Sequence, residues 1–223
     1  MTPKQAAGEA AARLVQPGML VGLGTGSTVF FLVEALGRRA RDEGLRFVGV
    51  PTSEATAAQA TRHGITLADP DAAIDLCIDG ADEVERGTLR LTKGLGGALL
   101  REKIVAELAG RYVVVADASK VVDRLGTRSP LPVEVVRFGL RATTRRIAEA
   151  GGAPTLRHRD GVPFVTDNGH VILDCAFGAI GDPFTLERTL RAIAGVVGTG
   201  LFLDVADAAL IAEDDGTVSE LHA

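Results

Sequence analysis

The first 120 residues alternate short apolar segments with segments of helical periodicity, and this alternation restricts the fold more than any other feature of the sequence. The apolar segments that predict strands are residues 19–23, 47–50, 74–78, 89–93 and 112–116. The segments that predict helices are residues 27–43, 51–63 and 98–109. Strands that alternate with helices form a mostly parallel sheet covered on both faces. We therefore predict an α/β fold built on a Rossmann-like, mostly parallel sheet.

The order of the elements changes after a stiff, proline-containing boundary at residues 129–132. The next segments predict strand, helix, strand, strand, helix and strand, at residues 133–136, 140–150, 155–159, 171–176, 186–193 and 196–202. This is the order of the ferredoxin-like motif. A last apolar segment, 208–212, is expected to rejoin the first sheet. We predict a Rossmann-like domain at 1–128 and 205–223, and a smaller ferredoxin-like α+β domain at 129–204.

Composition narrows the class of protein. A net charge of -5 and the lack of any Lys/Arg cluster longer than a pair argue against a nucleic-acid partner. The N-terminus has no apolar signal region, and a polar glycine-rich loop interrupts the most apolar stretch, residues 19–36. Cys77 and Cys175 lie in apolar segments, which predicts buried thiols in a reducing compartment. We expect a soluble cytoplasmic protein without a membrane partner.

Four polar segments each follow a predicted strand, at residues 24–28, 51–53, 79–82 and 117–120. In parallel sheets ligands bind beyond the carboxyl ends of the strands, so the four segments predict one site. In the first segment a helix N-terminus and the hydroxyls of Ser27 and Thr28 favour an anion. A dinucleotide fingerprint would need a third glycine at Ser27, and a Walker loop would need a Gly-Lys pair. The alternative is a tight turn without a ligand.

Asp79 and Asp82 flank Gly80 and Ala81 at the end of the third predicted strand. Carboxylates this close are expected to titrate as a coupled pair, with the pKa of one of them raised. An acid with a raised pKa exchanges a proton with a sugar hydroxyl near neutral pH. A helix cap or an Asx turn explains either aspartate alone equally well.

Lys93 begins a glycine-rich segment, and Glu102 lies in the first turns of the helix that follows. At this position Lys93 places an ammonium group opposite negative charge that develops on a substrate oxygen. If Leu100, Ile104 and Leu108 form the buried stripe, Glu102 faces away from the core side of its helix. The alternatives are a solvated Lys93 and a Glu102 that only interacts with the helix dipole.

Lys120 is a further candidate phosphate contact at the same edge of the sheet. The four histidines are scattered, with no metal-ligand spacing and no nucleophile partner, and no G-x-S-x-G elbow occurs. We therefore expect no metal site and no cofactor.

Nine segments together carry a family pattern: GLGTGST (22–28), PTS (51–53), DGADE (79–83), KG-x-GG (93–97), LREKI (100–104), ADASK (116–120), LPVEV (131–135), TDNG (166–169) and GVVGTGLF (195–202). The chain resembles the type A ribose-5-phosphate isomerase family over essentially its whole length, and departs from it at Leu95, where the family often has glycine. The resemblance implies a cofactor- and metal-independent aldose–ketose isomerase of the pentose phosphate pathway, which interconverts ribose 5-phosphate and ribulose 5-phosphate through a cis-enediolate. It also implies a homodimer or homotetramer, with residues 1–128 and 205–223 as the catalytic domain and residues 129–204 as a lid and oligomerisation domain.

Carried over position by position, the resemblance implies that Glu102 is the general base between C1 and C2. It implies that Asp79 and Asp82 assist ring opening and O1/O2 proton exchange, and that Lys93 stabilises the enediolate oxygen. The implied substrate-binding residues are Thr25, Gly26, Ser27, Thr28, Asp79, Gly80, Ala81, Asp82, Lys93, Gly94, Leu95, Gly96 and Lys120. Two alternatives remain: a related sugar-phosphate deaminase or lactonase, and a non-catalytic sugar-phosphate sensor.

Overall fold

A seven-stranded sheet with the strand order β17-β16-β7-β4-β1-β2-β3 forms the larger part of the computed structural model, which describes the whole chain, residues 1–223. Its strands are β1 (Leu20–Leu23), β2 (Val48–Pro51), β3 (Thr66–Leu67), β4 (Leu76–Gly80), β7 (Tyr112–Asp117), β16 (Ala208–Ala212) and β17 (Val218–Leu221). Every neighbouring pair is parallel except β16 and the edge strand β17. The predicted mostly parallel sheet, and the return of residues 208–212 to it, are confirmed.

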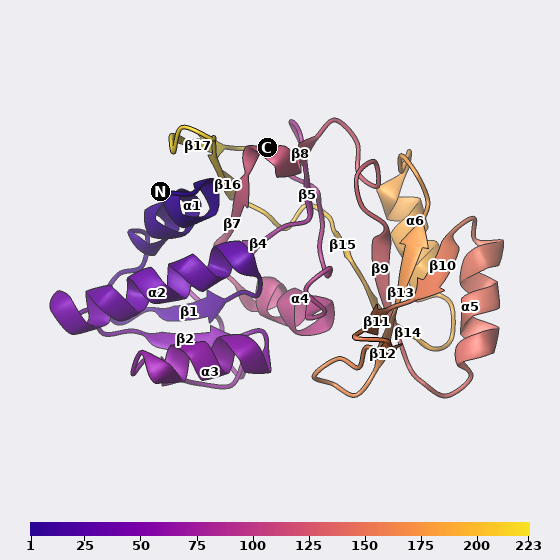
Figure 1. Cartoon of the computed structure of the whole chain (residues 1–223), viewed down its shortest axis with the longest axis horizontal. Coiled ribbons are helices and arrows are strands. Elements are labelled where there is room, and N and C mark those ends of the chain that lie inside the picture. The colour runs from indigo at the N-terminus through magenta and orange to yellow at the C-terminus, as the bar shows by residue number, and fades with distance from the viewer.

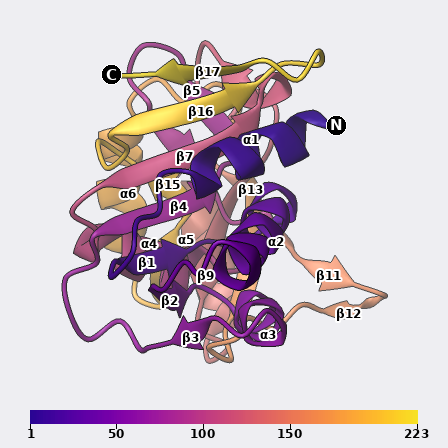
Figure 2. The ribbon, with the colours of Figure 1, turned by 90° about the vertical axis from the view of Figure 1, so that its left-hand side faces the viewer.

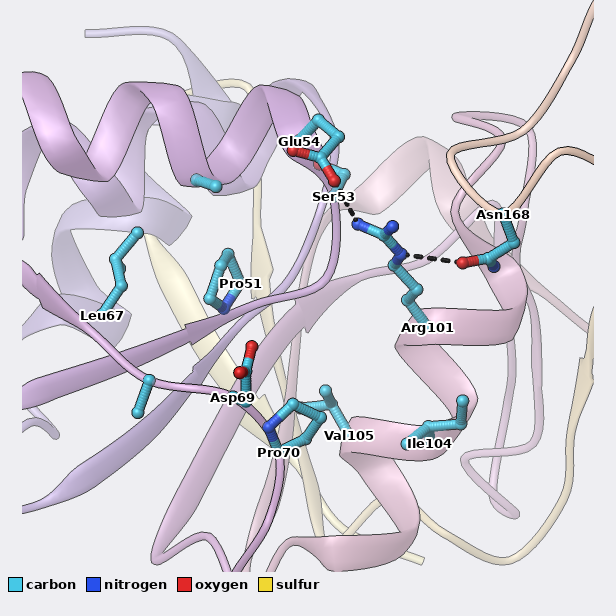
Figure 3. A pocket seen from close by; sticks show the side chains of 12 residues that line it. Pro51, Ser53, Glu54, Leu67, Asp69, Pro70, Arg101, Ile104, Val105 and Asn168 are labelled. Atoms are coloured by element: carbon cyan, nitrogen blue, oxygen red, sulfur yellow. Dashed lines mark hydrogen bonds and ion pairs between the residues drawn. The ribbon is translucent and has the colours of Figure 1, made fainter.

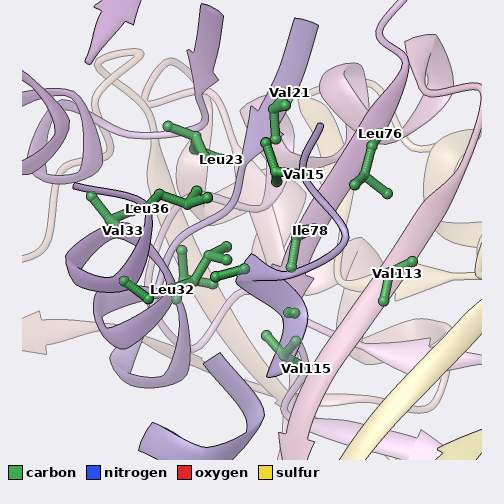
Figure 4. Close-up of a cluster of buried hydrophobic side chains, with 14 of the residues drawn as sticks. Val15, Val21, Leu23, Leu32, Val33, Leu36, Leu76, Ile78, Val113 and Val115 are labelled. Carbon is green, nitrogen blue, oxygen red and sulfur yellow. The ribbon is translucent and has the colours of Figure 1, made fainter. Parts of the chain in front are cut away.

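Helices cover both faces of this sheet. The helices of this part are α1 (Pro3–Ala12), α2 (Ser27–Asp42), α3 (Glu54–Arg62) and α4 (Leu99–Leu108). Strand side chains alternate between the faces, so Ile78 and Val113 pack in a core of 22 buried residues that α1 and α2 share (Figure 4). Cys77 and Val114 pack in a second core that includes residues of α4. No helix is long and apolar enough to cross a lipid bilayer.

The smaller part is a four-stranded antiparallel sheet with two helices, and α4 lies between it and the larger sheet (Figure 1). Its elements are β9 (Leu131–Val135), α5 (Leu140–Glu149), β10 (Ala153–Leu156), β13 (Val171–Ala176), α6 (Pro183–Arg191) and β14 (Val196–Thr199). The strand order β10-β13-β9-β14 is that of the ferredoxin-like motif, which confirms the prediction. The hairpin of β11 (His158–Arg159) and β12 (Val162–Pro163) projects from this part (Figure 2).

A third, small sheet contains the strand order β15-β6-β5-β8. Its strands are β5 (Glu83–Glu85), β6 (Leu91–Thr92), β8 (Val121–Val122) and β15 (Leu201–Phe202). The predicted single strand 196–202 is therefore two strands: β14 pairs with β9, and β15 pairs with β6. The chain changes sheets at Gly200, whose N–H donates to Pro132 O at 2.7 Å and whose carbonyl accepts from Lys93 N at 2.8 Å. The domain division at residues 129 and 204 stays a prediction.

The sequence reading missed α1. This helix has Thr2 at its N-cap, where the hydroxyl accepts from Gln5 N at 3.3 Å, and Pro3 in its first turn. A capping threonine followed by proline is a recognisable helix start, so the signal was present in the sequence.

Candidate active site

The four polar segments meet at one edge of the parallel sheet. Leu23 of β1 pairs with Pro51 of β2 and with Ile78 of β4, and Gly80 at the end of β4 pairs with Val115 of β7. Because parallel strands in this register end at the same edge, the segments that follow them are brought together, as the sequence predicted.

A cavity of about 290 Å³ opens at this edge. It is lined by Lys4, Thr25, Gly26, Ser27, Thr28, Gly80, Ala81, Asp82, Lys93, Gly94, Leu95, Gly96, Glu102, Ala116 and Lys120. Every candidate residue from the sequence lines it except Asp79, which lies behind Lys93 and is fully buried. Lys4 and Ala116 were missed, and Lys4 could be found only by recognising α1 and its position beside the sheet.

The inner end of the cavity is a buried ion cluster. Lys93 Nζ lies 3.0 Å from Asp79 Oδ2 and 3.3 Å from Glu102 Oε1, and donates to Gly80 O at 2.5 Å. The side chains of Lys93, Asp79 and Glu102 are 2%, 0% and 4% exposed. With both carboxyl groups ionised, the cluster would carry two negative charges and one positive charge in a place where water cannot screen them.

This arrangement shifts the proton affinities of its members. Burial, together with the charge of Asp79, raises the pKa of Glu102 to about 8, although Lys93 opposes the shift. Burial alone would lower the pKa of Lys93, but the charges of Asp79 and Glu102 raise that pKa above its ordinary value. Glu102 Oε2 is buried without a hydrogen-bond partner. A buried carboxyl oxygen without a partner, with a pKa near neutrality, is suited to receive a proton from a bound molecule.

The sequence prediction for the face of Glu102 was wrong. The buried residues of α4 are Leu99, Glu102, Val105 and Ala106, whereas Ile104 is 43% exposed. Glu102 therefore lies on the buried side of its helix, because Lys93 on the neighbouring segment supplies a charged partner there. The spacing of apolar residues along a helix cannot identify a buried face when that face carries a charged residue whose partner comes from another segment.

Asp79 is held by the backbone around it. Its Oδ1 accepts from Thr25 N at 3.1 Å and from Gly80 N at 2.7 Å. A Cβ at Gly24 would lie 2.0 Å from the same oxygen, so only glycine allows this close approach. These contacts fix the carboxylate so that Oδ2 faces Lys93.

Asp82 is held separately, by Leu95 N, which donates to its Oδ2 at 2.8 Å. Burial raises the pKa of Asp82, and the hydrogen bond from Leu95 and the charges of Lys93, Lys120 and Arg157 partly offset this. The raised pKa that was expected for one of the two aspartates is thus present, but its main cause is burial rather than the charge of the other aspartate.

The outer end of the cavity differs from the inner end because its positive groups have no acidic partners. The first helical residue of α2, Ser27, and its neighbour Thr28 line the cavity, and Lys4 and Lys120 lie on the same lining. Neither lysine forms an ion pair within the chain. Free N–H groups at a helix N-terminus and two unpaired ammonium groups make a site for an anion such as phosphate.

A larger cavity of about 590 Å³ lies on the other side of Arg101, which donates to Glu54 Oε1 at 2.9 Å and to Asn168 Oδ1 at 3.0 Å (Figure 3). None of the candidate site residues lines it, and it contains no buried charged group. The smaller cavity therefore carries the chemistry. No group of three or more His, Cys, Asp or Glu side chains is arranged to hold a metal ion.

Comparisons with known proteins agree with this geometry. The family model for "Ribose 5-phosphate isomerase A (phosphoriboisomerase A)" matches residues 48–216. A ribose-5-phosphate isomerase A from Thermomicrobium roseum is 56% identical over 216 residues, which are 96% of this chain and 91% of the relative. One from Roseiflexus sp. is 57% identical in an alignment of 224 positions that covers 99% of this chain and 95% of the relative.

Solved structures show the same likeness over the full length. The ribose 5-phosphate isomerase A of Methanocaldococcus jannaschii superposes with a TM-score of 0.94 at 39% identity and covers 99% of this chain and 98% of its own. A D-ribose-5-phosphate isomerase in complex with phospho-erythronic acid also has a TM-score of 0.94, at 36% identity, with 99% and 98% of the two chains covered.

Proposed function

The chain belongs to the ribose-5-phosphate isomerase A family and is an aldose–ketose isomerase, and we propose that it interconverts ribose 5-phosphate and ribulose 5-phosphate through a cis-enediolate. The observation that carries the mechanism is the buried contact between Lys93 and Glu102, with Glu102 Oε2 free beside the cavity.

The outer end of the cavity binds the substrate phosphate in this proposal. Ser27 and Thr28 at the N-terminus of α2 donate to the phosphate oxygens, and Lys4 and Lys120 neutralise their charge. Fixing the phosphate there directs the other end of the sugar chain towards Lys93 and Glu102, which line the same cavity.

The inner end moves the proton. Glu102 takes the proton from C2 of the open-chain aldose, the C–H electron pair forms the C1–C2 double bond, and the carbonyl electrons move onto O1. Lys93 stabilises the negative oxygen by its charge. Asp79 and Asp82 assist ring opening and move a proton from O2 to O1. Glu102 then returns its proton to C1, and O2 becomes the ketose carbonyl oxygen.

The relative solved with phospho-erythronic acid supports this assignment. That compound is a phosphorylated sugar acid whose planar carboxylate shares its shape and negative charge with an enediolate. A site built for both ends of such a molecule needs an anion pocket at one end and a buried cation at the other, and both are present here.

The test is turnover of ribose 5-phosphate in excess EDTA, with the wild type, Glu102→Gln and Glu107→Gln. We expect Glu102→Gln to lower kcat by at least about 10²–10⁴-fold because the base is lost. Glu107 is exposed on the same helix, so Glu107→Gln is the matched control and should keep full activity. Wild-type activity in Glu102→Gln would contradict the proposed base.

The same assay separates the alternative functions. A sensor would show a thermal shift with ribose 5-phosphate but no turnover in the wild type. A related deaminase or lactonase would act on amino sugars or lactones instead. Lys93, Asp82 and Glu102 line one cavity and Asp79 contacts Lys93 from behind, and this set favours the isomerase.

We further propose that the protein acts in the cytoplasm as a homodimer or homotetramer, with 129–204 as a separate lid and oligomerisation domain, as the family resemblance implies. Phe138 in this region is 94% exposed and Val162 is 62% exposed, which is apolar surface available for contact with a second copy. Light scattering after size-exclusion chromatography tests the assembly, and a monomer at micromolar concentration would contradict it.

A further inference from the structure

The ferredoxin-like part contributes no residue to the lining of the cavity, which comes entirely from residues 4–120. It nevertheless contacts one wall of the cavity, at Arg157 and at Phe164. Arg157, which follows β10, donates through one guanidinium nitrogen to Gly94 O at 2.8 Å and to Leu95 O at 3.1 Å. Both carbonyls belong to the glycine-rich loop, residues 93–97, that begins with Lys93 and forms that wall.

The guanidinium group is fixed from its other side. Its Nε donates to Asp174 Oδ2 at 2.9 Å, and a second nitrogen donates to Asp174 Oδ1, so the pair is bidentate. The side chains of Arg157 and Asp174 are 10% and 22% exposed. The planar guanidinium group donates to a carboxylate from one edge and to two carbonyls from the other side. These bonds define its orientation, and an ammonium group cannot form the same set.

A second contact between the ferredoxin-like part and the loop, made by the ring of Phe164, lies beside Arg157. Gly97 has a φ of +92°, and a Cβ there would lie 2.4 Å from Cζ of Phe164, so the ring packs directly on the loop backbone. Arg157 and Arg159 lie 6.0 and 4.5 Å from the centre of that ring. The loop is therefore covered by the ferredoxin-like part at two adjoining points.

Two backbone N–H groups of the loop bind elsewhere, one to the catalytic candidate Asp82 and one to Gly200. Leu95 N donates to Asp82, and Lys93 N donates to Gly200 O. The carbonyl of Gly94 and the N–H of Leu95 belong to the same peptide unit, so Arg157 and Asp82 bind opposite sides of one planar group. A displacement of the loop on the Arg157 side would be transmitted to Asp82 and to the backbone of Lys93.

We propose that Arg157 is a positioning residue for the isomerase reaction: it holds the Gly94 and Leu95 carbonyls so that the loop keeps Asp82 and Lys93 in their reactive geometry. The inference rests on the proposed function and adds a role for the ferredoxin-like part, which acts on the reaction through the backbone of one loop. Loss of this contact should reduce turnover more than substrate affinity, because the phosphate-binding residues at α2 do not depend on the loop.

The experiment compares Arg157→Met, Arg157→Lys and Arg146→Met with the wild type for kcat and KM on ribose 5-phosphate. Arg146 is exposed on α5 and provides the matched loss of an arginine in the same part of the chain. We expect Arg157→Met to lower kcat about 10- to 100-fold with KM changed less than about threefold, since a misplacement near 1 Å costs about 10²-fold. Arg157→Lys should recover only part of kcat, and Arg146→Met should match the wild type.

Amide hydrogen exchange supplies the second readout. Peptides that cover residues 94–97 should exchange faster in Arg157→Met and Arg157→Lys than in the wild type and in Arg146→Met. If Arg157→Met does not fold, Arg157→Lys, which keeps the positive charge next to Asp174, decides the matter. Wild-type kcat in a folded Arg157 variant, or a rise in KM without a fall in kcat, would overturn the proposal. A wild-type protein without turnover would instead refute the proposed function.

Discussion

The two ends of the cavity differ in the burial and the pairing of their charged side chains. At the inner end, Lys93, Asp79 and Glu102 are almost completely buried and neutralise one another only in part. At the outer end, Ser27 is exposed, and Lys4 and Lys120 have no ion-pair partner in the chain. Burial makes the inner charges strong and immobile, which suits charge that develops during reaction. Lys4 and Lys120 are half-buried rather than fully buried, so their charges are weaker but accessible, which suits capture of a phosphate from water.

The comparison predicts that Lys93→Ala has the largest effect. Removing the cation should lower kcat about 10²–10³-fold with a smaller change in KM, because its charge matters most for the enediolate. It also leaves two carboxylates buried without a cation, and breaking a buried pair costs about 3–5 kcal/mol of folding free energy. Steady-state kinetics and urea denaturation measure the two effects. An unchanged kcat with a raised KM would place Lys93 with the outer end instead.

The pH dependence of activity should show the burial of the inner end. Because the base must be a carboxylate and the pKa of Glu102 is about 8, kcat/KM should rise with pH up to about 8, with a slope of about tenfold per unit below it. An ordinary glutamate with a pKa of 4.5 would give a flat profile above pH 6. A flat profile measured from pH 6 to 9 would contradict the electrostatic difference between the two ends.

Folding stability gives an independent check with a defined sign. The folded protein retains the Glu102 proton up to about pH 8, whereas the unfolded chain loses it near the ordinary glutamate pKa of 4.5. The contribution of this group is therefore fully present below pH 4.5 and is lost as pH rises towards 8. Urea denaturation should show Glu102→Gln gaining stability relative to the wild type between pH 5 and pH 8. A constant difference across that range would be inconsistent with the raised pKa.

Lys120→Ala at the outer end should have the smallest effect. Loss of one accessible charge–phosphate contact is expected to raise KM roughly 3- to 10-fold, with kcat within about a factor of two. Added salt should reduce the difference between the variant and the wild type, because exposed charges are screened. A large fall in kcat would mean that Lys120 acts on the reacting carbons and that the division between the two ends is wrong.

The fold could be predicted where the signal is local. Alternating strands and helices up to residue 120 and the βαββαβ order after it define both sheets. The prediction failed where contacts between distant segments determine the structure. Strand β8 has only two residues, which is too short for a recognisable strand pattern. The segment 196–202 is divided between two sheets by the backbone hydrogen bonds of Gly200.

The site could be predicted in its residues but not in its electrostatics. The polar segments after the strands identified Asp79 and Asp82, because parallel strands end at one edge, and the glycine-rich segment 93–97 identified Lys93. The burial of Glu102 and the role of Leu95 N in holding Asp82 depend on contacts between distant segments, which periodicity along one helix cannot show. The place of Lys4 on the cavity could not be predicted because α1, the helix that carries it, was not predicted.

Helix α1 packs on α2 and β7, and also on β16, which lies near the carboxyl-terminal end of the chain (Figure 2). During synthesis the ribosome releases α1 about 200 residues before β16 emerges, and the surface that holds the helix is incomplete until then. Contacts of such long sequence separation form late and slow folding. A nascent chain that already has β1 to β7 therefore holds α1, and with it Lys4, through α2 and β7 alone, without the contacts that β16 adds.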